Sequence, residues 1–435
     1  MTVPLTLDAT QTDLADDVPV YAYIVGKVPD GFYRLDATGL PQPMQLADNA
    51  QTAGSFPGAG QLDPAVVAAL ADNYPQAWAD YSIPLARSGP ATWIDLSQIN
   101  TANLPSLGTG SAAFSGRIYI SVGVPRLPFT VQSGGYAAPV PYQDGPGAQC
   151  LFDWIEFSYD SDGNFNGNTT QVDQFGFTLI LDGAPGGSAQ GQPMVSRDAF
   201  IAQVQALPAP LAGQPLAIPI PAAIAPAYPT GLSWLRAISP KTLTGDPAAY
   251  GTAVSGWFDD EISTWYANWQ ATPLVVHDVA TGYYTGVVDP DSGVLNFYAG
   301  QYPTLAGWQA AAPPLAFALT GAAPSTVQFA SLDVWQCNNA LANGDAAQLN
   351  VGKNIAAAFN RGVVGYLLDD ADCSGAAAGF YPDGGTWNAW AQLTHAVSAN
   401  GLAYGFPYDD LCNQNPSIQL NGTQSVGVVL GDFYG

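Results

Sequence analysis

Residues 154–173 read WIEFSYDSDGNFNGNTTQVD and give the clearest structural signal in the chain. An apolar run of period two, 151–159, comes before a cluster of Asp, Ser, Asn and Gly, and a second such run covers 170–181. Two strand-like runs around a turn-forming cluster predict a β-hairpin. One acid falls inside each predicted strand, Glu156 in the first and Asp173 in the second, although strand interiors disfavour acids. Such acids pair with a cation, point to solvent, or act together in a cleft.

The chemistry open to this pair depends on the direction of the two side chains. In a regular hairpin, pairing direction and parity allow both acids to lie on one face. A carboxylate pair is the minimum equipment for splitting a glycosidic bond, and an inverting enzyme holds its two carboxyls roughly 6.5–9.5 Å apart around a water. One carboxyl must then stay protonated while the other stays ionised. The alternative is two solvated acids on an exposed sheet face.

The composition restricts the possible partners. The chain has 435 residues, and 35 acids against 10 bases give a net charge of −25. So few cations argue against binding to nucleic acid or to an anionic membrane. No apolar run reaches the roughly 18 residues that a membrane span needs. A neutral polysaccharide remains compatible, and abundant Trp, Tyr and Phe suit a sugar-binding groove, although most such rings fill cores.

The cysteines and histidines indicate no metal centre. Cys150, Cys337, Cys373 and Cys412 lack C-x-x-C spacing, and the chain has only two His, so a zinc site is not expected. No Gly-rich phosphate loop is present. We therefore expect no cofactor and no metal. We expect one or two disulfides in an exported protein, although the N-terminal MTVPLTLDATQTD lacks the basic region and apolar run of a leader.

The order of apolar runs and turn signals predicts two domains. Residues 1–190 are mostly strand-like, and the closing stretch 421–435 is expected to return to this β domain. Residues 191–420 are expected to form a mixed α/β domain that begins with a Pro-rich linker or loop at 207–229. Strands are expected at 20–25, 117–122, 129–132, 274–278, 283–288, 294–298 and 425–430, and helices at 64–81, 257–269, 354–360 and 387–400.

The hairpin also resembles a known pattern. EFSYDSDGNFNGNTTQVDQFGF, 156–177, resembles the thaumatin-like arrangement of an Ala-Glu-Phe-Thr strand followed by a Ser-Leu-Val-Asp-Gly-Phe strand, whose Glu and Asp line an acidic cleft. Glu156 and Asp173 fall on those positions. GRIYISVG, 116–123, resembles the arginine-bearing strand of that family and places Arg117 at the cleft arginine. TyrAspAsp at 408–410 resembles a later acidic segment.

The chain is far longer than a thaumatin and has too few cysteines for one. It more closely resembles glycoside hydrolase family 64, the bacterial β-1,3-glucanases with a thaumatin-like barrel and a mixed α/β domain. The supporting segments span nearly the whole chain in the expected order: YAYIVG (21–26), RIYISVG (117–123), FDWIEFSY (152–159), AAFNRG (357–362) and FYPDGGTWNAWAQLTHAVSANGLAYGFPYDDLCNQ (380–414).

This resemblance implies a wide groove between the two domains and inverting hydrolysis of linear β-1,3-glucan to short oligosaccharides. Glu156 would be the general acid and Asp173 the general base. The expected substrate-binding residues are Arg117, Ser158, Asp160, Tyr404, Phe406, Asp409 and Asp410. We expect a secreted monomer whose partner is β-1,3-glucan, with no nucleic acid or membrane. The alternatives are a thaumatin-like module that binds glucan without cutting it, and a hydrolase of another β-glucan.

Overall fold

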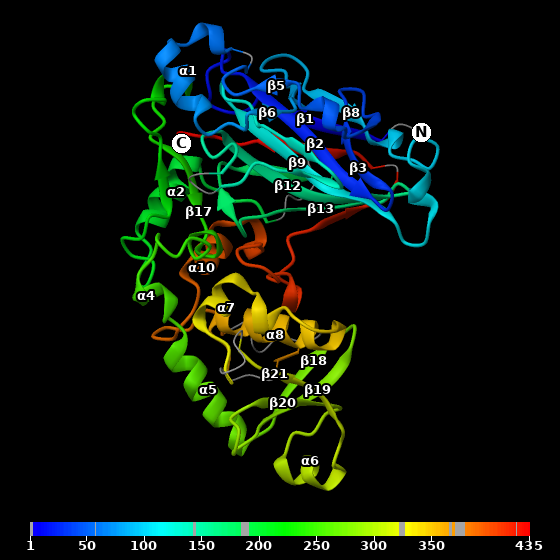
Figure 1. The fold of residues 1–435 in the computed structure, drawn as a ribbon, viewed down its shortest axis with the longest axis vertical. Coiled ribbons are helices and arrows are strands. Elements are labelled where there is room, and N and C mark those ends of the chain that lie inside the picture. Colours follow the sequence, from blue (N-terminus) through cyan, green and yellow to red (C-terminus); the bar gives the residue numbers. More distant parts are fainter. Residues whose placement is uncertain are drawn as a thin grey trace.

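The computed structural model describes residues 3–435 except 57, 142–144, 184–190, 322–326, 365–367, 370–378 and 423. Figure 1 shows an upper part built largely of strands and a lower part in which helices pack on a smaller sheet. We call these the β region, which holds β1–β13, β15, β23 and β24, and the α/β region, which holds α5–α8 and β18–β22. Helix α10 (Ala389–Val397) lies between them.

Two sheets with a shared core make up most of the β region. The larger runs β23-β13-β12-β9-β2-β3-β4, and β7 also pairs with β2. The smaller runs β15-β24-β1-β8. Strands β1 and β24 alternate buried and half-buried residues, so one face of the small sheet packs into the core that the large sheet also lines. On the other face of the large sheet, Lys27 of β2 and Ser115 of β9 are exposed, so that face is available for a site.

The strand bounds of the β region are as follows. In the larger sheet they are β2 (Val20–Val28), β3 (Gly31–Leu35), β4 (Pro41–Pro43), β7 (Ile83–Pro84), β9 (Ala113–Val122), β12 (Leu151–Asp160), β13 (Phe165–Thr169) and β23 (Ile418–Leu420). In the smaller sheet they are β1 (Pro4–Asp8), β8 (Thr92–Asp95), β15 (Leu179–Asp182) and β24 (Val426–Leu430). Two short ribbons are β5 (Gln51–Thr52) with β6 (Ala77–Trp78), and β10 (Thr130–Gln132) with β11 (Gly135–Ala137).

The predicted hairpin exists, but its second strand was placed wrongly. Strand β12 pairs with β13, which puts Asn168 opposite Glu156. The turn is shorter than predicted because Asp160 closes it: its carboxylate accepts the backbone N–H groups of Asp162 and Asn164, both at 2.9 Å. The Asn-rich stretch therefore forms the second strand, and Asp173 lies in a bend beyond it.

After this bend the chain joins a different sheet. Strand β14 (Gln174–Phe175) pairs with β17 (Trp234–Ile238), which in turn pairs with β16 (Ala217–Pro219). Helix α2 (Arg197–Gln205) packs beside them, with the rings of Phe175 and Phe200 3.9 Å apart. The Pro-rich stretch thus contains a paired strand, and residues up to about 238 pack against the β region.

The α/β region carries a sheet of order β21-β20-β19-β18-β22. Helix α5 buries Ile262, Trp265 and Tyr266, which confirms the apolar helical face read from 257–269.

The helix expected at 64–81 ends early, because 77–78 pairs as a strand instead. The remaining bounds are α1 (Pro64–Ala71), α3 (Pro240–Leu243), α4 (Thr252–Ser255), α5 (Asp259–Ala271), α6 (Leu305–Ala311), α7 (Ser331–Gln336), α8 (Ala346–Arg361), β18 (Leu274–Asp278), β19 (Gly282–Val288), β20 (Leu295–Ala299), β21 (Leu315–Leu319) and β22 (Leu368–Asp369).

The structure also bears on the expectations for membrane spans and for disulfides. Within the described ranges, no helix has the length and apolarity required to span a membrane. Cys150 and Cys337 are buried free thiols, whereas Cys412 is in a disulfide. The four cysteines therefore do not form two bridges.

Candidate active site

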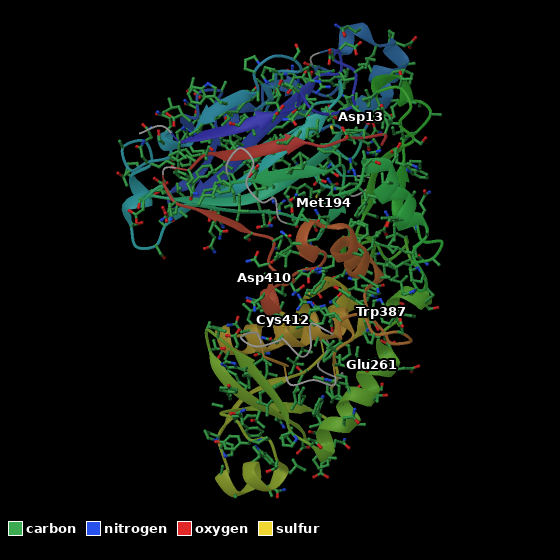
Figure 2. The ribbon with its side chains drawn as sticks, turned by 180° about the vertical axis from the view of Figure 1, so that it is seen from behind. Asp13, Met194, Glu261, Trp387, Asp410 and Cys412 are labelled. Carbon is green, nitrogen blue, oxygen red and sulfur yellow. The ribbon has the colours of Figure 1, made fainter. Side chains whose placement is uncertain are left out.

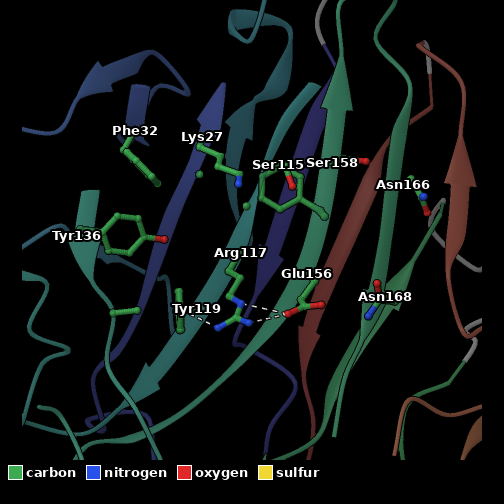
Figure 3. Close-up of a pocket in the computed structure, with 14 residues that line it drawn as sticks. Lys27, Phe32, Ser115, Arg117, Tyr119, Tyr136, Glu156, Ser158, Asn166 and Asn168 are labelled. Carbon is green, nitrogen blue, oxygen red and sulfur yellow. Dashed lines mark hydrogen bonds and ion pairs between the residues drawn. The ribbon is translucent and has the colours of Figure 1, made fainter. Parts of the chain in front are cut away.

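The outer face of the large sheet carries two rows of side chains in register. One row runs Arg34, Val25, Arg117, Glu156 and Asn168 across five strands. The next runs Phe32, Lys27, Ser115, Ser158 and Asn166 across the same strands. Residues two apart on a strand share a face, so the rows lie side by side. Eight residues of these rows line a groove of about 570 Å³, namely Arg117, Glu156 and Asn168 of the first row and Phe32, Lys27, Ser115, Ser158 and Asn166 of the second (Figure 3).

Glu156 lies in this groove, held by a basic residue on the next strand. Arg117 donates from Nη2 at 2.8 Å and from Nε at 3.1 Å to the Glu156 carboxylate. The guanidinium also stacks 4.9 Å from the Trp154 ring and donates to the Tyr119 hydroxyl at 3.3 Å. The two side chains are 35% and 38% exposed, so the pair is fixed in position but open to a ligand. The structure thus places Arg117 where the sequence suggested a cleft arginine.

Asp173 belongs to a different element and does not line the groove, but its charge acts on Arg117. Its carboxylate forms an ion pair with Lys241 of α3, and its backbone carbonyl accepts from Ser239 N and the Thr242 hydroxyl at 3.0 and 2.7 Å. Its side chain is 20% exposed. The start of α3 therefore fixes the bend that carries Asp173.

The charges of both acids act on one guanidinium. Burial alone would lower the pKa of Arg117, but Tyr119, Glu156 and Asp173 outweigh it, and the pKa is raised. Burial raises the pKa of Tyr119, Arg117 opposes that shift, and the two carboxylates add to it. Glu156 and Asp173 therefore share an electrostatic site although they are not hairpin partners.

Of the four residues predicted to contact substrate in the 404–410 segment, Tyr404 and Asp410 stay predictions, and neither lines the groove. The carbonyl of Tyr404 accepts from Gln171 N at 2.9 Å, and its hydroxyl donates to Asp410 at 3.3 Å. Burial raises the pKa of Tyr404, and the charges of Asp410 and Glu156 raise it further. Tyr404 and Asp410 therefore lie on the Glu156 side of the segment. Figure 2 labels Asp410 where the segment passes between the β region and the α/β region.

Three of the proposed substrate contacts are corrected by burial or by competing bonds. Phe406 is 1% exposed and lies under the Arg361 guanidinium at 5.4 Å, so it is a core residue. Asp409 is fully buried, and its carboxylate bonds Arg361 and His395 at 2.8 and 3.0 Å. Asp160 uses its carboxylate to close the hairpin turn and does not line the groove. Ser158, by contrast, does line it.

The groove differs in position and charge from the expected acidic cleft between two domains. All the residues that line it belong to the β region, between 26 and 168. Its charged side chains are two cations, Lys27 and Arg117, and one acid, Glu156. Aromatic walls are present: Phe32 and Tyr136 line it with their rings 5.7 Å apart, edge to face (Figure 3). In the ranges that the structure describes, no three His, Cys, Asp or Glu side chains gather as metal ligands.

Several site residues were missed from the sequence. Asn166 and Asn168 alternate with Phe165, Gly167 and Thr169, a period-two pattern that would have revealed the true second strand. Lys27 and Ser115 lie two residues outside the predicted strands 20–25 and 117–122, because β2 extends to Val28 and β9 begins at Ala113. Lys241 gives no sequence signal, because its link to Asp173 spans 68 residues.

Comparison with known proteins shows the family and agrees with this fold. The family model of the glycoside hydrolase family 64 enzymes, described as β-1,3-glucanase, matches residues 2–430. The chain therefore belongs to glycoside hydrolase family 64. No curated protein matches the sequence.

Solved structures share the fold at low sequence identity. A laminaripentaose-producing β-1,3-glucanase in complex with laminaritetraose has a TM-score of 0.69 at 21% identity, over 99% of both chains. A β-1,3-glucanase domain from Clostridium beijerinckii has a TM-score of 0.69 at 20% identity, over 99% of this chain and 98% of the other. A laminaripentaose-producing β-1,3-glucanase from Paenibacillus barengoltzii, complexed with laminarihexaose, has a TM-score of 0.54 at 20% identity, over 99% and 75%.

Proposed function

We propose that this protein is an endo-β-1,3-glucanase that hydrolyses linear β-1,3-glucan with inversion and releases short laminari-oligosaccharides. Membership of the family supports the linkage, and relatives of the same fold were crystallised with laminaritetraose and laminarihexaose. The observation that carries the proposal is that Arg117, paired with Glu156 in a groove, also feels the charge of Asp173 from a separate element. The volume of that groove falls in the usual range for ligand sites.

The ion pairs assign the working oxygens. Both bonds from Arg117 end on Oε1 of Glu156, so Oε2 is the oxygen that can protonate the glycosidic oxygen (Figure 3). Lys241 engages Oδ1 of Asp173, which leaves Oδ2 to take a proton from the attacking water. Glu156 thus acts as general acid and Asp173 as general base, on opposite faces of the sugar ring.

The groove lining suits a neutral sugar chain. Phe32 and Tyr136 offer ring faces for the apolar faces of pyranose rings, and Ser115, Ser158 and Asn166 offer hydroxyl and amide groups for sugar hydroxyls. Tyr404 and Asp410 extend this polar lining on the Glu156 side. A β-1,3-glucan is therefore the partner that we propose.

We also propose two domains in a secreted monomer: a thaumatin-like β domain, expected at 1–190 and 421–435, and a mixed α/β domain, expected at 191–420, with the boundary between them moved to about 240. The pairing of β24 with β1 and β15 supports the return of the C-terminal stretch. The pairing of β14 with β17 favours a boundary nearer to 240.

The test is incubation with linear β-1,3-glucan, with the newly formed reducing ends followed by proton NMR. The α anomer should appear first and then mutarotate, because a single displacement inverts a β linkage. An initial β anomer would reject inversion. Binding of the glucan without any release of reducing ends would instead support the non-catalytic binding module, in which the cation-paired acids serve structure and binding.

A further inference from the structure

Helix α10 contacts both the bend that leads to Asp173 and the 404–410 segment. Its Trp390 indole donates to the Gln171 carbonyl at 3.1 Å, in the bend that leads to Asp173. Five residues further along the helix, the His395 imidazole hydrogen-bonds the carboxylate of Asp409, in the 404–410 segment, at 3.0 Å. The helix lies between the β region and the α/β region (Figure 1). Its histidine has no part in the proposed chemistry, so its buried position needs another explanation.

Both ring nitrogens of His395 face acceptors. Nδ1 lies 2.7 Å from the Gly401 carbonyl, and Nε2 lies 3.0 Å from Oδ2 of Asp409. The other carboxyl oxygen of Asp409 takes the ion pair with Arg361, and Oδ2 also accepts from Gly405 N at 2.8 Å. A neutral imidazole carries one N–H and can serve one of these acceptors, whereas an imidazolium serves both. The geometry therefore requires a protonated ring.

The charged surroundings agree with that state. Asp409 faces His395 on one side and the buried Arg361 of α8 on the other. The Tyr381 ring lies 6.1 Å from the imidazole, and burial keeps its hydroxyl neutral by raising its pKa. Burial lowers the pKa of His395, but the Asp409 charge and the hydrogen bonds that the ring donates to Asp409 and to the Gly401 carbonyl outweigh this and raise it. Arg361 opposes the rise only as a minor contribution.

This buried group fixes the segment that carries Tyr404. Arg361 donates to the Asp409 backbone carbonyl at 2.9 Å, and Gly405 N donates to its side chain, so the segment is held at both ends. Tyr404, next to Gly405, is in turn tied to Gln171 N. Loss of the His395 hydrogen bonds would therefore loosen Tyr404 and the bend before Asp173.

We propose that His395, an imidazolium between Gly401 and Asp409, is a positioning residue that keeps Tyr404 beside Glu156. Its effect on turnover rests on the proposed glucanase function. Deprotonation leaves one buried acceptor unpaired, which loosens the 401–410 stretch. Because the folded protein holds this proton more tightly than the unfolded chain, its stabilising effect is present below the ordinary histidine value of 6.5 and is lost as pH rises through the higher folded value.

The protonation state can be measured directly, because the chain has only two histidines. His277 lies on β18, stacked 4.0 Å from Tyr283 and outside the proposed site, so a His277→Gln variant leaves His395 as the single imidazole. Long-range ¹H–¹⁵N NMR of this variant should show both ring nitrogens mainly protonated at pH 6.5, with a midpoint above that. A ring mainly neutral at pH 6.5 would overturn the proposal.

The positioning effect is tested with His395→Gln, with His277→Gln as the matched control. Hydrogen exchange of peptide 402–411, followed by mass spectrometry, should be faster in His395→Gln and unchanged in the control. On linear β-1,3-glucan, kcat/KM at pH 6 should fall roughly tenfold or more, because small displacements of positioning groups have effects of that size. The fall in wild-type activity at the His395 midpoint should be absent from His395→Gln.

The outcomes separate this inference from the glucanase proposal. If the wild-type protein releases no sugar, the function is wrong, and exchange and NMR still decide the role of His395. If the wild-type protein is active but peptide 402–411 exchanges equally in both proteins, the positioning role is wrong and the function stands. If His395→Gln does not fold, exchange of the His277→Gln protein across the NMR midpoint decides: no acceleration above it would overturn the proposal.

Discussion

Both hydrogen bonds from Arg117 to Glu156 end on the same carboxyl oxygen, Oε1. A guanidinium often binds a carboxylate through two oxygens, and that arrangement would occupy the whole group. Here one oxygen anchors the side chain and the other remains available. Lys241 likewise bonds one carboxyl oxygen of Asp173, Oδ1. Each acid is therefore oriented by a cation without being blocked, as an acid and base on opposite sides of a scissile bond require.

The first prediction concerns the two acids. Glu156→Gln and Asp173→Asn should each lower kcat on linear β-1,3-glucan by at least about a hundredfold, because each removes a proton-transfer group. Asp162→Asn is the matched control: Asp162 is an exposed acid in the same hairpin turn. Turnover should be measured alongside the melting temperature. Near-wild-type turnover in a folded variant of either acid would remove that residue from the mechanism.

The second prediction separates the two cations by pH. Lys241→Met removes the cation paired with the proposed base, so the acidic limb of the kcat/KM profile should move to higher pH. Arg117→Met removes the cation paired with the proposed acid, so the basic limb should move to higher pH. Profiles of both folded variants against wild type provide the measurement.

Each outcome of this comparison is informative. If the acidic limb moves more in Arg117→Met than in Lys241→Met, and the basic limb moves in Lys241→Met instead, Glu156 is the base and the two roles are exchanged. If neither limb moves in either variant, both ion pairs are structural only. Arg126→Met is the control, since Arg126 pairs with Asp80 outside the groove.

The third prediction concerns substrate binding. Phe32→Ala removes an aromatic wall of the groove but leaves the acids and their cations in place. We expect KM for laminari-oligosaccharides to rise by roughly five- to thirtyfold, on the scale of 1–2 kcal/mol for a lost ring contact, with kcat little changed. Trp93→Ala is the control, because Trp93 is exposed on β8 of the other sheet. A fall in kcat at constant KM would place Phe32 in the chemistry instead.

The sequence predicted the strands around the site better than their pairing. Period-two patterning located β2, β9 and β12, because each has a buried face. The alternation at 165–169 was missed because Asn and Gly are also typical of turns, and the register depends on the turn that Asp160 closes. The burial of Asp409 was also not predictable from the sequence. Its burial depends on Arg361 and His395, 48 and 14 residues away, and no local pattern reports such contacts.

The last prediction concerns the support of Asp173. Trp390 is fully buried, and its indole N–H is the bond from α10 to the Gln171 carbonyl. Trp390→Phe keeps an aromatic ring but leaves that carbonyl unpaired, which should lower the free energy of unfolding by about 1–3 kcal/mol. Because Gln171 leads to Asp173, kcat should fall about tenfold or more while KM changes less. Urea unfolding measures the loss of stability, and steady-state kinetics measure kcat and KM. A destabilised variant with full kcat would show that the contacts with α3 position Asp173 without the bond from Trp390.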